Sequence, residues 1–238
     1  MMARIFLGGS FDPVHDGHLD MVRLVHHRLS SLDMPFVISF LPTAGNPFKG
    51  TPTDPTHRLN MLSLACDMLK HQGITASIDT SEIHQTPPVY TIDTVRALAR
   101  WYPDDERIFV MGGDSLASLH LWKNYKELLA YVKIWAFDRA GSDDVVADVL
   151  AKMTDDFDKF LQDGFLQDDL LKDELLKDEL LKTDKTFNTK RIFYDKSPIP
   201  AVSSTQIRHA LVQGDKPCHL PEPIFDYIKT HELYKSVL

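Results

Sequence analysis

The stretch Gly8-Gly9-Ser10-Phe11-Asp12-Pro13-Val14-His15-Asp16-Gly17-His18 decides the fold, because it directly follows the apolar run Ile5-Phe6-Leu7. We interpret this order as a buried strand, a glycine turn and the start of a helix. His15 and His18 flank Gly17 where the helix is expected to begin. Backbone N–H groups and the helix dipole favour anions at such a place, and the imidazoles add hydrogen-bond donors. Without a Cβ, Gly17 lets a ligand approach the backbone. The stretch therefore predicts a polyphosphate site.

Other phosphate motifs fit this sequence less well. The chain lacks G-x-x-x-x-G-K-[ST], and the glycine spacing is not G-x-G-x-x-G. The second apolar run, Phe36–Leu41, ends in Pro42 rather than in an acidic residue that would bind a ribose. The structural alternative is a glycine turn with two surface histidines.

Composition limits the class of protein. The 238 residues are 43% hydrophobic, enough for one sizeable core, and we expect a single domain over 1–238. A formal net charge of −8 does not suggest binding to nucleic acid or to an anionic membrane. No apolar run approaches the roughly 20 residues of a membrane span. The residues before the first strand leave no room for a secretory signal, so we expect a cytoplasmic protein. Cys66 and Cys218 are interpreted as free buried thiols, with a disulfide left open.

Short apolar runs alternate with helical patterns along the chain. We expect strands at Arg4–Leu7, Phe36–Leu41, Thr75–Ile78, Arg107–Met111, Ile134–Phe137 and Arg191–Phe193. We expect helices at His18–Leu29, Thr56–His71, Thr91–Trp101, Tyr125–Ala130, Asp143–Lys152, Ser204–Gln213 and Pro223–His231. This alternation predicts an α/β fold, a Rossmann-like doubly wound parallel sheet with helices on both faces. Ligands of such sheets bind at the carboxyl ends of the strands, where the Gly8–His18 turn is expected.

A repeat of five residues interrupts this alternation. From Phe160 to Asp184 the sequence reads FLQDG, FLQDD, LLKDE, LLKDE, LLKTD. Because five residues advance a helix by about 500°, successive apolar pairs rotate around the axis and form no single apolar face. Residues 155–185 hold eleven acidic and five basic side chains. We expect a solvated insertion at about 155–185, between adjacent core strands; a partner-binding or oligomerising helix is the alternative.

A second phosphate-binding element is expected near the C-terminus. In Val202-Ser203-Ser204-Thr205-Gln206-Ile207-Arg208, either Ser203 or Ser204 is suited to cap the following helix. Hydroxyl and N–H groups of that first turn can bind phosphate oxygens, and Arg208 lies about one turn further on.

With these two motifs at opposite ends, the chain resembles the HxGH nucleotidylyltransferases, and within them the bacterial nicotinate-nucleotide adenylyltransferase family. The closer resemblance lies in Asn46-Pro47-Phe48-Lys49, His57-Arg58, Val89-Tyr90-Thr91-Ile92-Asp93-Thr94, Gly112-Gly113-Asp114-Ser115, Leu121-Trp122 and Arg139. Phe48 stands where that family usually has histidine, and Val89 where serine is usual.

The resemblance implies transfer of an adenylyl group from ATP to nicotinate mononucleotide, with Mg²⁺ carried by ATP and no dedicated metal site. It implies His15, His18 and Arg208 as catalytic residues. It implies ATP contacts at Gly8, Gly9, Ser10, Phe11, Gly17, Gly112, Asp114, Ser204 and Thr205. It implies nicotinate mononucleotide contacts at Lys49, Tyr90, Thr91, Trp122 and Arg139. From the residues alone, a helix cap is the preferred role for Asp114 and core packing is the more frequent role of a tryptophan such as Trp122; only the resemblance assigns them to ligand contact.

Several alternatives remain open at this point. Other HxGH nucleotidylyltransferases, of phosphopantetheine or nicotinamide-mononucleotide type, share the expected chemistry and differ in substrate. A non-catalytic nucleotide sensor, with the acidic repeat as its interaction arm, is the alternative from another class. A homo-oligomer is compatible with the sequence.

Overall fold

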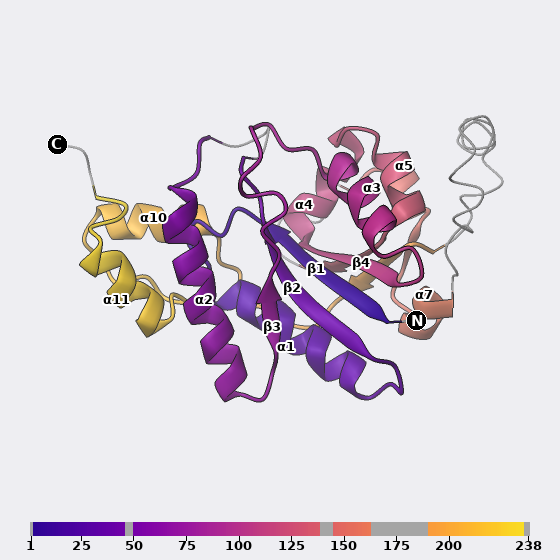
Figure 1. Ribbon diagram of the computed structural model, residues 1–238, viewed down its shortest axis with the longest axis horizontal. Coiled ribbons are helices and arrows are strands. Elements are labelled where there is room, and N and C mark those ends of the chain that lie inside the picture. The colour runs from indigo at the N-terminus through magenta and orange to yellow at the C-terminus, as the bar shows by residue number, and fades with distance from the viewer. Residues whose placement is uncertain (1, 46–49, 139–144, 163–189, 236–238) are drawn as a thin grey trace. The chain divides into compact units, whose positions relative to one another are not determined.

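The computed structural model describes residues 2–45, 50–138, 145–162 and 190–235 (Figure 1). Its seven strands form one parallel sheet in the order β3-β2-β1-β4-β5-β7-β6, flanked by helices, which confirms the predicted Rossmann-like α/β fold. The strands are β1 Ala3–Gly9, β2 Phe36–Pro42, β3 Ala76–Ile78, β4 Glu106–Gly112, β5 Lys133–Phe137, β6 Met153–Thr154 and β7 Ile192–Asp195.

The helices follow the predicted order with some additions. They are α1 Asp16–Ser30, α2 Pro55–His71, α3 Thr91–Trp101, α4 Gly113–Ala117, α5 Tyr125–Tyr131, α6 Ala147–Leu150, α7 Phe157–Gln162, α10 Ser204–Val212 and α11 Glu222–Thr230, with the 3₁₀ turn η1 at Leu119–Leu121. Contacts group the chain into two compact units. Unit 1 comprises Met1–Phe6, Met34–Phe36 and Tyr90–Pro198, and unit 2 comprises Leu7–Asp33, Val37–Val89 and Ile199–Leu238.

Local signals explain the helices of unit 2. On α1, Leu19, Val22, Val25 and Leu29 recur every three or four residues and are buried, as expected of a helix with one apolar face. The α2 helix begins as its sequence predicted, because the Asp54 carboxylate accepts a hydrogen bond from the Thr56 N–H at 2.8 Å. Such residues fix helix ends without help from distant parts of the chain.

Helix α11 packs on α2 within the same unit, as Figure 1 shows. The Tyr227 hydroxyl lies 2.9 Å from Nδ1 of His57 and accepts a hydrogen bond from Asn60 at 2.8 Å. The chain that follows α11 therefore starts from a fixed point on α2.

Strands β5 and β7 form the centre of unit 1. They pair in parallel, with Ile134 opposite Ile192, which confirms the expectation that core strands on either side of the repeat are neighbours. Every residue of β5 is buried. Trp135 packs against Phe193 at 5.4 Å between ring centroids and donates a hydrogen bond to Asp195 at 3.1 Å.

The start of the expected insertion is part of this core. Phe157 lies 5.0 Å from Trp135 and Phe160 lies 5.6 Å from Phe193, measured between ring centroids. Phe160 is fully buried, and Leu161 accepts a hydrogen bond from Lys133 at 3.0 Å. The expected solvated segment does not extend to these residues, because aromatic contacts hold them. The rest of the expected insertion, at 163–185, lies outside the described residues.

Two further expectations were wrong. Within the described part of the helix expected at Asp143–Lys152, only Ala147–Leu150 is α-helical. Ala151 and Lys152 form a turn, because the next residues, Met153 and Thr154, pair with Ile192 and Phe193 as β6. The two cysteines are free but not buried as expected: Cys218 is exposed and Cys66 is half-buried. Partial burial raises the pKa of the Cys66 thiol to about 11.

Candidate active site

The turn between β1 and α1 places two histidines at a helix N-terminus in unit 2. His15 has extended backbone and occupies the N-cap, and His18 is the third residue of the helix. The His15 N–H donates to Nδ1 of His18 at 3.3 Å, and the two rings stack with centroids 3.8 Å apart. Because Nδ1 accepts, neutral His18 holds its proton on Nε2 and remains a donor. Both imidazoles thus lie at the helix N-terminus, beside the first backbone N–H groups and at the positive end of the helix dipole.

Small and aromatic residues pack this histidine pair. A Cβ at Gly17 would lie 3.1 Å from the His15 ring, so glycine is the residue that leaves space for that imidazole. Phe11 packs edge-on to His18 at 5.0 Å, and a Cβ at Gly9 would lie 3.0 Å from the Phe11 ring. Phe11 has a φ of 50°, which is rare for a large side chain. The glycines predicted for ligand approach therefore also shape the protein around the histidines.

Helix α10 joins this turn, as the C-terminal motif predicted. Ser203, one of the two expected caps, accepts a hydrogen bond from the Gln206 N–H at 3.2 Å. The Ser204 hydroxyl donates to the Pro13 carbonyl at 2.9 Å, and Arg208 donates to the Asp12 carbonyl at 2.6 Å. The second guanidinium nitrogen of Arg208 lies 3.3 Å from the Thr205 hydroxyl. Residues almost two hundred positions apart in sequence are therefore neighbours around the two histidines.

Arg58 is a structural residue of this site that the sequence indicated only through the family resemblance. It is fully buried on α2. Its Nε donates to the Thr53 carbonyl at 2.8 Å, and its Nη1 donates to the carbonyls of Ser10 at 2.9 Å and Thr43 at 2.7 Å. Burial lowers the pKa of Arg58, and the Asp12 charge opposes that shift. One guanidinium thus fixes three loops, including the predicted ATP contact Ser10.

The second group of predicted residues lies in unit 1. Gly112 ends β4 and is buried, and Asp114 lies exposed in the first turn of α4. Tyr90 occupies the N-cap position of α3, and Thr91 is the first helical residue. The structure therefore places these predicted contacts at the carboxyl end of a strand or at a helix N-terminus, where polar groups face ligands in folds of this kind.

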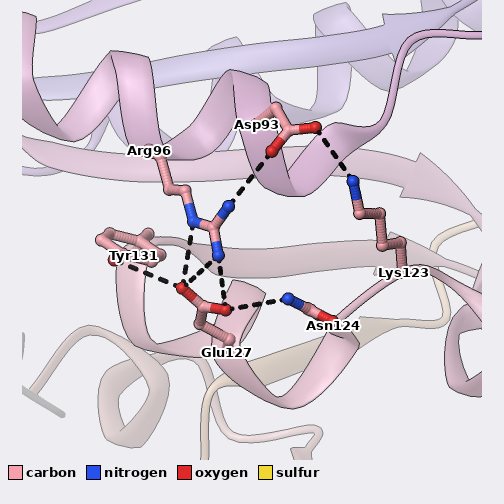
Figure 2. Close-up of polar contacts among 6 residues, drawn as sticks. All are labelled: Asp93, Arg96, Lys123, Asn124, Glu127 and Tyr131. Carbon is pink, nitrogen blue, oxygen red and sulfur yellow. Dashed lines mark hydrogen bonds and ion pairs between the residues drawn. The ribbon is translucent and has the colours of Figure 1, made fainter. Parts of the chain in front are cut away.

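Trp122 belongs to the same unit and directly precedes two residues of a polar network, Lys123 and Asn124 (Figure 2). Its ring is half-buried and meets Phe109 edge-on at 6.4 Å. The next residue, Lys123, lies 3.5 Å from the Asp93 carboxylate, and its ammonium group lies 4.4 Å from the centre of the Tyr90 ring. The loop that presents Trp122 is thus tied to the start of α3, close to Tyr90 and Thr91.

Figure 2 shows the ion pair beneath this loop. Arg96 Nη2 donates to both carboxylate oxygens of Glu127 at 2.8 Å, and Asn124 donates to the same carboxylate at 3.1 Å. Partial burial acts to lower the pKa of Arg96, but the Glu127 contacts outweigh it and raise that pKa. The network joins α3 to α5 and holds Asn124, the residue that follows Lys123.

The structure leaves two predicted residues untested. Lys49 and Arg139, like Phe48, lie outside the described residues. Val89, which replaces the usual serine, is buried, and its N–H donates to the Gly45 carbonyl at 3.2 Å.

Comparison with known proteins shows the family of this chain. The cytidylyltransferase-like family matches residues 6–210. The chain belongs to the cytidylyltransferase-like family. A protein of Idiomarina loihiensis named "Probable nicotinate-nucleotide adenylyltransferase" is 30% identical, covering 98% of this chain and 100% of that one. A protein of Shewanella frigidimarina with the same name is 32% identical, covering 96% of this chain and 98% of that one.

A solved structure shares the fold of this cytidylyltransferase-like chain. It is the Plasmodium falciparum nicotinic acid mononucleotide adenylyltransferase complexed with NaAD, with a TM-score of 0.66 at 15% identity, covering 98% of each chain. At such low identity the likeness concerns the fold.

Within 2–45, 50–138, 145–162 and 190–235, no three or more His, Cys, Asp or Glu side chains cluster as metal ligands. Among the same residues, no helix is long and apolar enough to cross a membrane.

Proposed function

We propose that this chain transfers the adenylyl group of ATP to nicotinate mononucleotide, releasing nicotinate adenine dinucleotide and pyrophosphate. The observation behind the proposal is the joining of Arg208 and α10 to the turn that stacks His15 and His18 at a helix N-terminus. Full-length relatives whose names give this activity support the choice of substrate.

The proposed reaction needs charge stabilisation more than a base. A phosphate oxygen of the mononucleotide forms a bond to the α-phosphorus of ATP while the bond from that phosphorus to the pyrophosphate oxygen breaks. The attacking phosphate is largely dianionic at pH 7, since its second pKa is about 6, so no proton has to be removed. The protein supplies in-line positioning and donors for the charge on the α-phosphate and on pyrophosphate. His15, His18 and Arg208 are the donors we assign to that role, with Ser204 and Thr205 beside them.

The residues of unit 1 are assigned to the nucleoside and the pyridine. Asp114 is proposed to accept hydrogen bonds from ribose hydroxyls, and Trp122 to stack on the pyridine ring. The nicotinate carboxylate is proposed to bind at Tyr90 and Thr91, because the dipole of the 11-residue helix α3 favours a negative charge there. Lys49 and Arg139 are further nicotinate mononucleotide contacts that the resemblance predicts.

Magnesium enters this proposal as part of the substrate. Mg²⁺ keeps several water ligands and binds the phosphate oxygens of ATP, so the reaction needs no metal cage made of protein side chains. The ion supplies positive charge to the triphosphate.

A substrate panel tests the proposal. We expect pyrophosphate release with MgATP and nicotinate mononucleotide, with a kcat/KM at least tenfold above that for nicotinamide mononucleotide. The amide directs its own NH₂ at a donor that suits a carboxylate, and an unpaired buried donor costs about 1–3 kcal/mol. Equal kcat/KM values for the two mononucleotides would favour an enzyme of the nicotinamide-mononucleotide type. Turnover of phosphopantetheine would indicate another HxGH nucleotidylyltransferase. Nucleotide binding without turnover would indicate a sensor.

A further inference from the structure

Tyr234, near the C-terminal end of the sequence, contacts the turn that holds the two histidines. It lies four residues after the end of α11, half-buried, with a φ of 58°. Its hydroxyl donates to Oδ1 of Asp12 at 2.6 Å. Burial first, and then the Asp12 charge, raise the pKa of Tyr234, so the hydroxyl keeps its proton and donates throughout the working pH range. An aromatic residue rarely adopts this backbone conformation, so its contacts must hold it there.

Asp12 is also the residue that binds Arg208. The Asp12 carbonyl accepts from Arg208 Nη1 at 2.6 Å, whereas the same nitrogen lies 3.7 Å from the carboxylate oxygen Oδ2. Oδ2 accepts a hydrogen bond from the Thr53 N–H at 3.2 Å. The carboxylate is 9% exposed. Arg208 is thus held through a neutral carbonyl, and its ion pair with the carboxylate is long.

This division of contacts matters for phosphate binding. A carboxylate and a guanidinium prefer a short bidentate ion pair, with two parallel hydrogen bonds between the opposite charges. Such a pairing would neutralise the charge that Arg208 offers to phosphate. In the observed arrangement, Tyr234 occupies Oδ1 and Thr53 occupies Oδ2, so the carboxylate is held away from that pairing.

We propose that Tyr234 is a positioning residue for phosphate binding: its hydroxyl holds the Asp12 carboxylate so that Arg208 keeps its charge for the substrate. The inference rests on the proposed function only where turnover is measured. Binding of inorganic pyrophosphate, the product of any nucleotidyl transfer from a triphosphate, tests it independently of the second substrate.

Tyr234→Phe is the first test, because it removes the hydroxyl and keeps the ring. We expect the affinity for magnesium pyrophosphate, measured by calorimetry, and the kcat to fall about tenfold, the loss of one hydrogen bond of ordinary strength. The KM for nicotinate mononucleotide is expected to stay within about twofold of the wild-type value, since Arg208 is assigned to ATP phosphates. Tyr125→Phe is the matched control. It removes a hydroxyl that bonds Asp148, a residue with no assigned part in phosphate binding, and it should leave pyrophosphate affinity and kcat unchanged.

A double-mutant cycle with Asp12→Asn identifies the route of the effect. Asparagine keeps the size of the side chain but cannot form an ion pair with Arg208. If Tyr234 acts through the Asp12 charge, adding Tyr234→Phe to Asp12→Asn changes pyrophosphate affinity less than twofold.

Two results would overturn the inference. One is a Tyr234→Phe protein that melts at a lower temperature yet binds pyrophosphate like the wild type, which would show a purely structural tyrosine. The other is a tenfold loss that persists in the Asp12→Asn background. A wild-type protein that binds pyrophosphate but does not use nicotinate mononucleotide would refute the proposed function and leave the Tyr234 test valid.

Discussion

Replacing His18 by alanine tests the site most directly. The variant loses an imidazole donor at the N-terminus of α1, where we place the charge that develops on the phosphates. Loss of one such donor lowers kcat by about 10²–10³. The structural cost is smaller. The 3.3 Å hydrogen bond from His15 and the ring stacking at 3.8 Å are both lost, at about 1–2 kcal/mol together. For a chain of this length, that lowers Tm by about 2–8 °C.

Two further variants separate these effects. His18→Asn keeps an oxygen that can accept from the His15 N–H, so it should recover part of the Tm while kcat remains low. His27→Ala, at an exposed position in the last turn of the same helix, should change neither quantity. The assay is pyrophosphate release at saturating MgATP, measured well below Tm. A kcat of His18→Ala within about fivefold of the wild type would refute the catalytic assignment, and a collapse of Tm would indicate a core histidine instead.

Three further perturbations test other parts of the structure. Arg96→Ala leaves the buried Glu127 carboxylate without its main cation and should lower the free energy of unfolding, measured with denaturant, by about 2 kcal/mol. Asp93→Asn, at a side chain 51% exposed, should lower it by less than about 1 kcal/mol. Equal losses of unfolding free energy would contradict the role of burial. Replacing residues 163–189 by a glycine-serine linker should leave kcat within about twofold, whereas starting the deletion at 155 removes α7 and should prevent stable folding. Tyr125 and Lys152 hold the pKa of Asp148 at about 2, below its ordinary 3.8, so the carboxylate stabilises the fold above about pH 4 and loses this effect as the pH falls toward 2. Because Asp148 is 40% exposed, the gap in Tm between wild type and Asp148→Asn should be only a few degrees at pH 6 and should close by pH 2; a gap independent of pH would refute this reading.

The sequence alone determined the parallel α/β fold and most of its elements. Helix α3 has the predicted bounds, Thr91–Trp101, and α2 starts at the predicted Asp54-Pro55 cap. These successes depend on short-range chemistry. Apolar runs the length of a strand, caps and prolines act within one or two turns of the chain, so a single segment contains the whole signal. The pairing of His15 and His18 across Gly17 is a signal of the same kind.

The tertiary structure decided which residues support the site. Phe157 and Phe160 lie among the first residues of the expected acidic insertion, yet packing on Trp135 and Phe193 ties them to the core. The helix expected to reach Lys152 ends at Leu150, because the chain then turns into β6, which pairs with β7. In both cases contacts from elsewhere in the chain outweigh local preference.

Asp12 and Tyr234 give the clearest case. Asp12 lies within the motif that predicted the site, but its partner is 222 positions away. A hydrogen bond over that separation leaves no periodicity, spacing or cap in either segment. Its geometry is set by the sheet, by α11 packing on α2 and by burial, and therefore exists only once the chain has folded.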